Sequence, residues 1–291
     1  MNDATKIKTL AQELATSFVK NYKCPLPDAI DFFYDKLSKY QEISQLITTA
    51  ASSKQLSKNA LFKEFVKKNK KELYYKLRKY KSNNDSKTEL LQSLNDGAAA
   101  DQLLQKLAQV HVSSHERFSE NEAFYNALSK TFESASVIAD AGCGVQPLFF
   151  PKHQFPSVSK YIALDKDRES IEIMLRFKEA FPDNYEWLHP MVWNISEGWE
   201  QICQTFNLDT FDVALILKVV PVVKRIDPNL LDELAKVPAN KIVVSGVKES
   251  MVKKHDIEHK ERRAITNFIK DSGREIIDEF ELSNEFFIIV S

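Results

Sequence analysis

The residues best suited to chemistry lie in one short stretch, where an apolar segment ends in Asp140 and continues into a Gly-x-Gly turn at Gly142 and Gly144. The chain has only 6 Gly in 291 residues, so two glycines within three positions indicate a specific backbone requirement. Glycine accepts positive φ angles and has no Cβ, which lets a ligand lie directly against a tight turn between a strand and a helix. The stretch therefore predicts a turn that binds a nucleotide-like cofactor.

A second carboxylate, Asp165, ends the next predicted strand about 20 residues beyond the turn, where nucleotide-binding folds place an acid that accepts hydrogen bonds from a ribose. The alternative is that Asp165 only caps the helix that follows. Dinucleotide-binding proteins use a related turn with a third glycine, but Pro147 stands at that position here. The pattern therefore favours S-adenosylmethionine over a nicotinamide cofactor.

Other reactive side chains are weaker candidates. Cys143 lies inside the turn, on the wrong side to attack an acceptor. His255 and His259 have the spacing of a zinc-binding helix, but they lie in a highly charged run, so we expect no metal site. Trp193 is interpreted as core packing, with contact to an adenine as the alternative.

The composition is that of a soluble globular protein, with 43% hydrophobic and 28% charged residues. No stretch approaches the ~18 apolar residues of a membrane span, and the first residues contain no signal-peptide core. The three cysteines show no Cys-x-x-Cys spacing, which argues against disulfides and a zinc ribbon. We expect a cytoplasmic monomer that does not bind a membrane.

Charge is distributed unevenly along the chain. The net charge is -1, yet residues 57–81 carry ten Lys or Arg and two Glu, which is +8 and leaves -9 for the remainder. Such a segment, with aromatic residues interleaved, predicts a surface that binds RNA. The alternative is a solvated lysine face over a small aromatic core. The side chains that we expect to contact RNA here are Lys67, Lys68, Lys70 and Lys71.

Two hydrophobic patterns divide the chain. Helical spacing predicts helices over 7–22, 28–40, 43–50, 61–80, 90–110 and 116–132, with a polar, turn-prone boundary at 82–87. Short β-branched runs then predict strands at 137–141, 161–164, 187–193, 211–217, 241–247, 275–282 and 285–290. Strands that alternate with helices are typical of a parallel sheet. We predict an α/β fold with the Rossmann-like sheet of a class I methyltransferase over 106–291, preceded by a basic, all-helical, RNA-binding domain over 1–105.

Several motifs, in the same order, resemble those of the aminoglycoside-resistance 16S rRNA methyltransferases. They are His-Val-Ser-Ser-His-Glu-Arg-Phe at 111–118, Asp-Ala-Gly-Cys-Gly-Val-Gln-Pro-Leu at 140–148, Ala-Leu-Ile-Leu-Lys-Val-Val-Pro at 214–221 and Glu-Phe-Phe-Ile-Ile-Val at 285–290. That family methylates N7 of a guanine in the ribosomal decoding site. The resemblance implies the same cofactor, S-adenosylmethionine, and the 30S subunit as partner.

The resemblance also implies roles by position. Arg117 would pair with the methionine carboxylate of the cofactor, a bidentate task that suits a guanidinium. The remaining cofactor residues would be Asp140, Gly142, Gly144, Asp165, Asn194 and Leu217, which the parallel sheet would bring to the carboxyl ends of its strands. Lys218 would orient the base or contact phosphate, with a structural ion pair as the alternative.

Some positions depart from the family pattern. Asn194 replaces an Asp, and Gln146 replaces an Asn. The family's RNA-contacting run after Ser245 is absent, although three lysines keep positive charge there, and we expect them to contact RNA: Lys248, Lys253 and Lys254.

Guanine N7 has a free lone pair and no proton to lose, so methylation there needs no general base. Proximity and alignment would then lower the barrier, by roughly 7 to 11 kcal/mol in favourable cases. Two alternatives remain open. The same chemistry could act on tRNA, another rRNA site or a protein, or the fold could serve a non-catalytic RNA-binding or ribosome-assembly factor.

Overall fold

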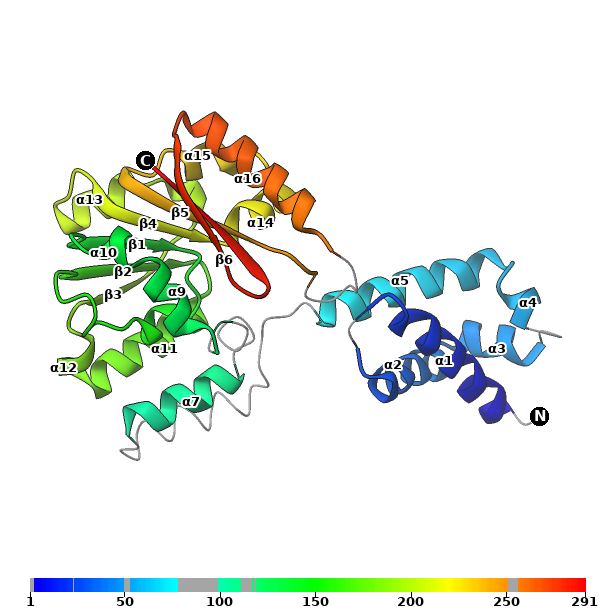
Figure 1. Cartoon of the computed structure of the whole chain (residues 1–291). Helices are drawn as coiled ribbons and strands as arrows, with labels where there is room; N and C mark the ends of the chain where they lie inside the picture. The colour runs from blue at the N-terminus through cyan, green and yellow to red at the C-terminus, as the bar shows by residue number, and fades with distance from the viewer. Residues whose placement is uncertain are drawn as a thin grey trace. The chain divides into compact units, whose positions relative to one another are not determined.

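A computed structural model describes residues 3–22, 24–49, 53–77, 99–110, 117, 119–250 and 256–291 (Figure 1). The chain divides into two compact units, Met1–Lys79 with Glu249–Asp256, and Tyr80–Lys248 with Ile257–Ser291. Within the described ranges, no helix combines the length and the apolar character that a membrane span requires.

The first unit is helical in its described residues, as predicted. Its helices are α1 (Asp3–Val19), α2 (Leu26–Lys39), α3 (Gln41–Thr49), α4 (Ser53–Leu56) and α5 (Ala60–Leu77). One apolar face of each long helix enters a common core, for example Phe18 of α1, Phe33 of α2 and Phe65 of α5. Helix α2 begins before Asp28 because Pro27 lies in its first turn, where the missing N–H of a proline costs no hydrogen bond.

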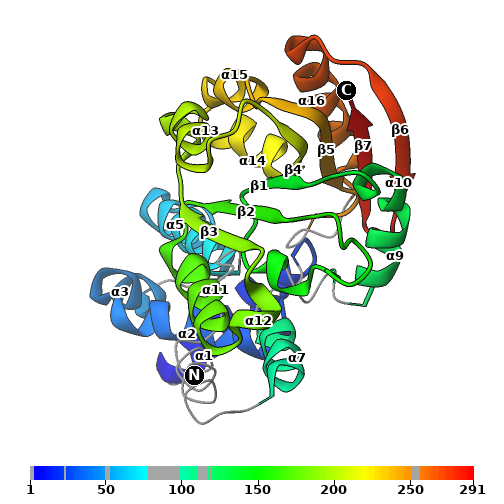
Figure 2. The ribbon, with the colours of Figure 1, turned by 90° about the vertical axis from the view of Figure 1, so that its left-hand side faces the viewer.

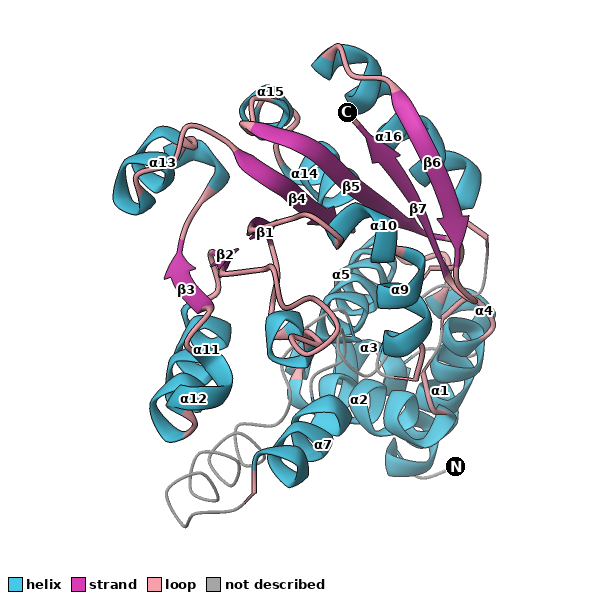
Figure 3. Cartoon of the chain, turned by 60° about the vertical axis from the view of Figure 1, so that its left-hand side comes forward, coloured by secondary structure: helices cyan, strands magenta, loops and turns pink. Residues whose placement is uncertain are grey.

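The second unit is built on a seven-stranded sheet in the order β3-β2-β1-β4-β5-β7-β6 (Figures 2 and 3). The strands are β1 (Val137–Ala141), β2 (Lys160–Asp165), β3 (Leu188–Val192), β4 (Phe211–Leu217), β5 (Ala239–Val247), β6 (Ile276–Glu281) and β7 (Glu285–Val290). The first five run parallel, whereas β7 is antiparallel to both β5 and β6. This confirms the predicted α/β fold, its seven strands and the closing hairpin.

Successive side chains of a strand point to opposite faces, so the sheet forms two cores. Ile138 of β1 packs in the core that includes residues of α7 (Ala100–Val110), α9 (Asn121–Ala127), α10 (Ser129–Phe132), α11 (Arg168–Ala180) and α12 (Pro182–Tyr185). Ala139 packs in the core that includes residues of α13 (Glu200–Phe206), α14 (Val219–Ile226), α15 (Leu230–Ala235) and α16 (Glu258–Ser272). Both faces are therefore covered, as a largely parallel sheet requires.

The domain boundary expected after residue 105 falls inside α7. Leu103 and Leu107 of this helix are fully buried in a core of the second unit, and the contacts place the boundary at Lys79. Helical periodicity assigned α7 to the helical domain because that pattern does not reveal which core a helix covers.

The order of strands places the candidate site. The chain turns from β1 toward β2 and β3 on one side and toward β4 and β5 on the other, so the strand order reverses between β1 and β4. Open α/β sheets bind their ligands at the carboxyl ends of the strands beside such a point. The glycine turn follows β1 directly, and Asp165 and Lys218 lie at the ends of the neighbouring strands β2 and β4.

Candidate cofactor site

The turn after β1 has a backbone that glycine suits. Gly142 and Gly144 have φ angles of 72° and 57°. A Cβ on Gly142 would lie 2.7 Å from Cγ2 of Val219, the first residue of α14. The amide of Gly142 donates to the carbonyl of Leu164 in β2 at 2.7 Å, which fixes the turn against the sheet. The turn thus presents bare backbone, as a closely bound ligand needs.

Asp165 joins this turn to the end of β2. Its Oδ2 accepts a hydrogen bond from the amide of Gly144 at 2.8 Å, and its Oδ1 accepts one from the amide of Asp167 at 2.8 Å. Asp167, rather than Asp165, is the residue that precedes α11. A carboxylate has about four acceptor positions, so Asp165 keeps capacity for the hydroxyls of a ribose.

Asp140 contributes a buried acid beneath the turn. Its Oδ2 accepts a hydrogen bond from the hydroxyl of Tyr161 at 2.8 Å, while its Oδ1 has no hydrogen-bond partner among the described residues. Burial raises the pKa of Asp140 to about 7, although the hydroxyl of Tyr161 and the charge of Arg117 act in the opposite direction. A buried acceptor of this kind fits a ligand that brings a donor or a positive charge.

Arg117 and Lys218 meet at a buried carboxylate, Glu285, the first residue of β7. Nη2 of Arg117 lies 2.6 Å and 2.8 Å from the two oxygens of Glu285, and the hydroxyl of Ser245 donates to the same carboxylate at 2.5 Å. Nζ of Lys218 lies 3.3 Å away. Burial by itself would raise the pKa of Glu285. The positive charges of Arg117 and Lys218 have the larger combined effect, so the pKa of Glu285 is lowered. The carboxylate is therefore ionised and holds both cations.

The ion pair that was one alternative for Lys218 is thus present, and Arg117 faces Glu285 in this structure. No hydrogen bond from Nη1 of Arg117 is seen within the described part of the chain. A guanidinium has five N–H donors, so pairing with Glu285 leaves donors for a ligand carboxylate. Its pairing with a methionine carboxylate remains a prediction.

Lys218 also has an unusual backbone. Its φ is 62°, a left-handed conformation that is uncommon outside glycine. Its amide donates to the carbonyl of Ser245 at 3.2 Å and to the hydroxyl of Ser245 at 3.0 Å, which hold the turn between β4 and α14. Strained residues of this kind are typical of functional sites.

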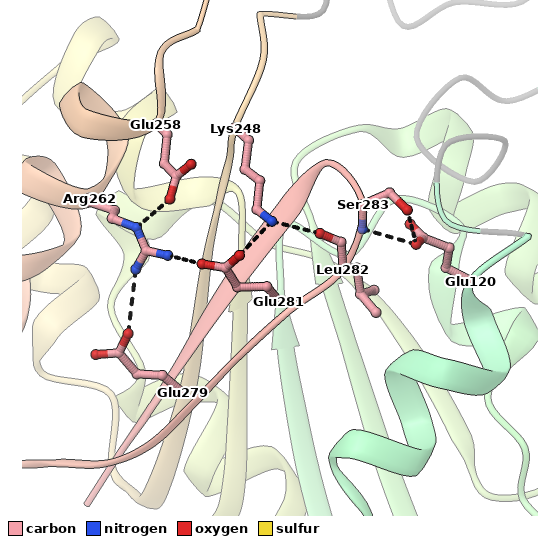
Figure 4. Close-up of polar contacts among 8 residues, drawn as sticks. All are labelled: Glu120, Lys248, Glu258, Arg262, Glu279, Glu281, Leu282 and Ser283. Atoms are coloured by element: carbon pink, nitrogen blue, oxygen red, sulfur yellow. Dashed lines mark hydrogen bonds and ion pairs between the residues drawn. The ribbon is translucent and has the colours of Figure 1, made fainter.

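A surface network fixes the hairpin that carries Glu285 (Figure 4). The amide and hydroxyl of Ser283 both donate to Glu120, three residues beyond Arg117, at 3.0 Å and 2.6 Å. Lys248 pairs with Glu281 at 2.6 Å and donates to the carbonyl of Leu282 at 3.0 Å. Arg262 joins the same network through Glu258, Glu279 and Glu281. Lys248, which we expected at the RNA, thus supports the hairpin; an additional contact to RNA remains a prediction.

The other predicted site residues have structural contacts. Asn194 precedes the short helix η2 (Ile195–Glu197) and accepts a hydrogen bond from the amide of Ser196. Trp193 is buried and packs against Trp199, with ring centroids 4.6 Å apart, as core packing predicts. Leu217 is half-buried at the end of β4. Contact of Asn194 and Leu217 with a cofactor remains a prediction.

Two further residues of the turn are buried. Burial raises the pKa of the Cys143 thiol well above its ordinary value, which disfavours a thiolate nucleophile. Gln146, which replaces the family's Asn, donates to the side chain of Asn121 at 2.9 Å and so ties the turn to α9.

The predicted RNA-binding lysines differ in their surroundings. Lys67, Lys68 and Lys71 are exposed on α5, whereas Lys70 is half-buried and donates to the hydroxyl of Ser17 at 3.2 Å. Lys253, Lys254 and His255 lie outside the described residues. Among the residues that are described, no three His, Cys, Asp or Glu side chains are grouped as metal ligands.

Sequence reasoning did not assign roles to Glu285, Ser245 and Tyr161. The available signal was Glu285 itself, a charged residue at the start of a strand whose residues are all buried. A buried carboxylate requires a partner, but its partner Arg117 lies 168 residues away in the chain.

Comparisons with known proteins agree with this geometry. The model of the ribosomal RNA methyltransferase family FmrO matches residues 92–290. A 16S rRNA (guanine(1405)-N(7))-methyltransferase of Frankia casuarinae is 28% identical over 116 residues, which cover 40% of this chain and only 38% of that protein.

Solved structures are similar as well. The 16S rRNA methylase ArmA is 25% identical, with a TM-score of 0.53, over 70% of this chain and 96% of ArmA. The 16S rRNA methyltransferase RmtF, solved with S-adenosyl-L-homocysteine, has a TM-score of 0.55 over 82% of this chain and 87% of RmtF. At 17% identity, the second likeness concerns the fold alone.

Proposed function

Because this chain belongs to the family of ribosomal RNA methyltransferases that FmrO represents, we propose that it transfers a methyl group from S-adenosylmethionine to RNA. The proposed acceptor is N7 of a guanine in the decoding region of 16S rRNA, on the 30S subunit. The observation that carries the proposal is the hydrogen bond from Gly144 to Asp165, which joins a bare glycine turn to an acid at the next strand end. We further propose that the protein acts as a monomer in the cytoplasm.

The residues of the site fit this cofactor. The backbone of Gly142 and Gly144 would lie against it, and Asp165 would accept hydrogen bonds from its ribose. Arg117 has donors that no described residue accepts from, and these suit its carboxylate; Oδ1 of Asp140, which has no hydrogen-bond partner among the described residues, suits its ammonium group. When bound, S-adenosylmethionine supplies a methyl group on a positively charged sulfur.

The protein's contribution to methyl transfer would be positioning. N7 of guanine attacks through a free lone pair, so no side chain has to remove a proton. Glu285 holds Lys218 and Arg117 beside the ends of β4 and β5, and this fixed arrangement would align the base with the donor. Lys218 is proposed to orient the base or a phosphate.

Transfer of tritium from labelled S-adenosylmethionine tests the acceptor. The protein is given 30S subunits, naked 16S rRNA and bulk tRNA in parallel, and label is mapped by the strand scission that 7-methylguanosine permits. We expect label in 16S rRNA at a single guanine. Label only in tRNA or in protein would reject this acceptor. It would favour the alternative that the same chemistry acts on tRNA or a protein, which is consistent with the absence of the family's RNA-contacting run after Ser245.

Calorimetry separates an enzyme from a non-catalytic factor with the same fold. We expect S-adenosylmethionine to bind the wild-type protein and to bind Asp165→Ala at least tenfold more weakly. Asp209→Ala, an acidic residue in the turn before β4, serves as the control and is expected to bind normally. Absence of binding to the wild-type protein would favour the non-catalytic factor.

A further inference from the structure

The helical unit contains an open groove between α1 and α5, with a volume of about 690 Å³. This volume lies within the range of about 300 to 1,000 Å³ found for small-molecule sites. All the residues that line the groove belong to the first unit, Met1–Lys79. The groove is therefore a property of that unit alone.

One wall of the groove is aromatic. Tyr22, just after α1, stacks on Phe18 with ring centroids 4.2 Å apart, and it lies 5.6 Å from the ring of Tyr74 on α5. Tyr22 and Tyr74 are half-buried and both line the groove. Phe18, on which Tyr22 stacks, is fully buried. The ring of Tyr22 is thus held in place by packing and still borders the open volume.

The other side of the groove is basic. Lys63, Lys67, Lys70 and Lys71 line it, and this spacing along α5 places them on one side of the helix. Lys70 is half-buried, and this burial lowers its pKa. Within the described residues no acidic side chain lines the groove, and Glu72 of α5 pairs with Lys36 of α2 at 2.5 Å.

We propose that this groove binds one unpaired nucleotide of the RNA, with its base against Tyr22 and Tyr74 and its phosphates at the lysines. The inference rests on the proposed action on RNA and adds the form of RNA that the helical unit recognises. Bases in a duplex are stacked on one another, so their faces do not reach an aromatic wall inside a groove. An unpaired base offers its face, and a basic groove with aromatic side chains is the arrangement that binds single strands.

Matched tyrosine variants of the full chain test the aromatic wall. Binding of a fluorescent ten-nucleotide single-stranded RNA and of a blunt duplex of the same sequence is measured by anisotropy. We expect Tyr74→Leu to weaken single-strand binding by about 5- to 150-fold, the range that loss of base stacking gives. Tyr34→Leu is the control, because Tyr34 is an exposed tyrosine of α2 that does not line the groove.

Tyr74→Phe keeps the ring and is expected to bind as the wild-type protein does, which separates loss of stacking from loss of folding. Equal losses for Tyr74→Leu and Tyr34→Leu, or stronger binding of the wild-type protein to the duplex than to the single strand, would overturn the proposal.

A lysine pair tests the basic side. Lys67 lines the groove and Lys68 does not, yet both are exposed on the same helix. We expect Lys67→Glu to weaken single-strand binding at least fivefold more than Lys68→Glu does. Equal effects would indicate that RNA binds to a diffuse charged surface, and they would overturn the proposal that the groove binds a nucleotide. Methylation of 30S subunits is measured separately. If the wild-type protein binds single strands through the groove but methylates no rRNA, the proposed methyltransferase function is rejected, whereas the proposal that the groove binds a nucleotide is supported.

Discussion

At the scale of single residues, the candidate site contains three residues in a left-handed backbone conformation. Gly142 and Gly144 after β1 and Lys218 after β4 all have positive φ. For a residue with a side chain, a left-handed conformation costs roughly 1 to 2 kcal/mol. Lys218 tolerates that cost because Ser245 accepts two hydrogen bonds from its amide and Glu285 pairs with its side chain.

Gly142→Ala tests the need for bare backbone in the turn. A methyl group would meet Val219 at 2.7 Å, so we expect a loss of S-adenosylmethionine affinity of at least tenfold, measured by calorimetry. Gly273→Ala is a matched control, because its φ is 69° but a Cβ there meets no atom within 4 Å. Both variants should lose roughly 1 to 2 kcal/mol of stability from backbone strain. Normal cofactor affinity of Gly142→Ala would contradict the role of the turn.

Glu285→Gln tests the buried ion pairs. The substitution removes the carboxylate that pairs directly with the buried Arg117, so we expect the free energy of unfolding to fall by about 3 to 5 kcal/mol, measured in urea. Glu281→Gln, in the same hairpin, removes an exposed partner of Lys248 and Arg262 and should change stability little. Similar losses for the two variants would show that Glu285 is no more important than a surface ion pair.

Asp140 gives stability a defined pH dependence. Its pKa is raised from 3.8 to about 7, so between these values the folded protein keeps a proton that the unfolded chain releases. Stability therefore decreases as pH rises through this window. We expect Tm to fall more between pH 5 and pH 8 in the wild-type protein than in Asp140→Asn, measured by calorimetric scans. An equal fall in both proteins would show that Asp140 titrates normally.

At the scale of elements, the hairpin of β6 and β7 completes the site. It brings Glu285 beside Ser245 of β5, and its turn is tied to Glu120 by Ser283. Close packing holds β5 against β7, because a Cβ on Gly246 would lie 2.6 Å from Cζ of Phe286 and 3.0 Å from Cδ1 of Ile265.

Gly246→Ala should therefore destabilise the second unit by about 1 to 3 kcal/mol through overpacking, measured by urea unfolding. Phe286→Leu makes room for the added methyl group, so the double variant should lose less than the sum of the single variants. Strict additivity would show that the contact with Phe286 is not the cause.

At the scale of the whole molecule, charge and cofactor chemistry lie in different units. Residues 57–79, which belong to the first unit, carry nine Lys or Arg and two Glu, which is +7 in a chain of net charge -1, whereas the glycine turn and its acids lie in the second, α/β unit. Binding of RNA and binding of cofactor should therefore respond to different substitutions.

Reversing the charges of Lys67, Lys68, Lys70 and Lys71 together should weaken RNA binding and leave the affinity for S-adenosylmethionine unchanged. For wild-type protein, log Kobs should fall linearly with log salt concentration, with a slope of about -0.7 for each phosphate contacted in a single strand. The quadruple variant should show a shallower slope, measured by anisotropy in a salt series. Unchanged RNA affinity would reject the basic segment as an RNA-binding surface.

Local features of the sequence determined much of this protein. The helical period of the apolar residues predicted α1, α2, α3 and α5 of the first unit, because burial of one helix face imposes that period on each segment, but it did not predict the short helix α4. Short β-branched runs predicted all seven strands, because such residues favour the strand conformation. The Gly-x-Gly turn and the acid after the next strand were also predicted, since a positive φ and a strand end depend on neighbouring residues.

Only the tertiary structure decided which distant side chains meet and how deeply they are buried. In the structure, α7 packs in the α/β core, and Arg117 and Lys218 both pair with Glu285. Asp140 is buried, and Lys67 lines the groove whereas Lys68 does not. Burial and long-range pairing depend on how complete elements pack together, and the residues next to each position in the sequence do not determine that packing.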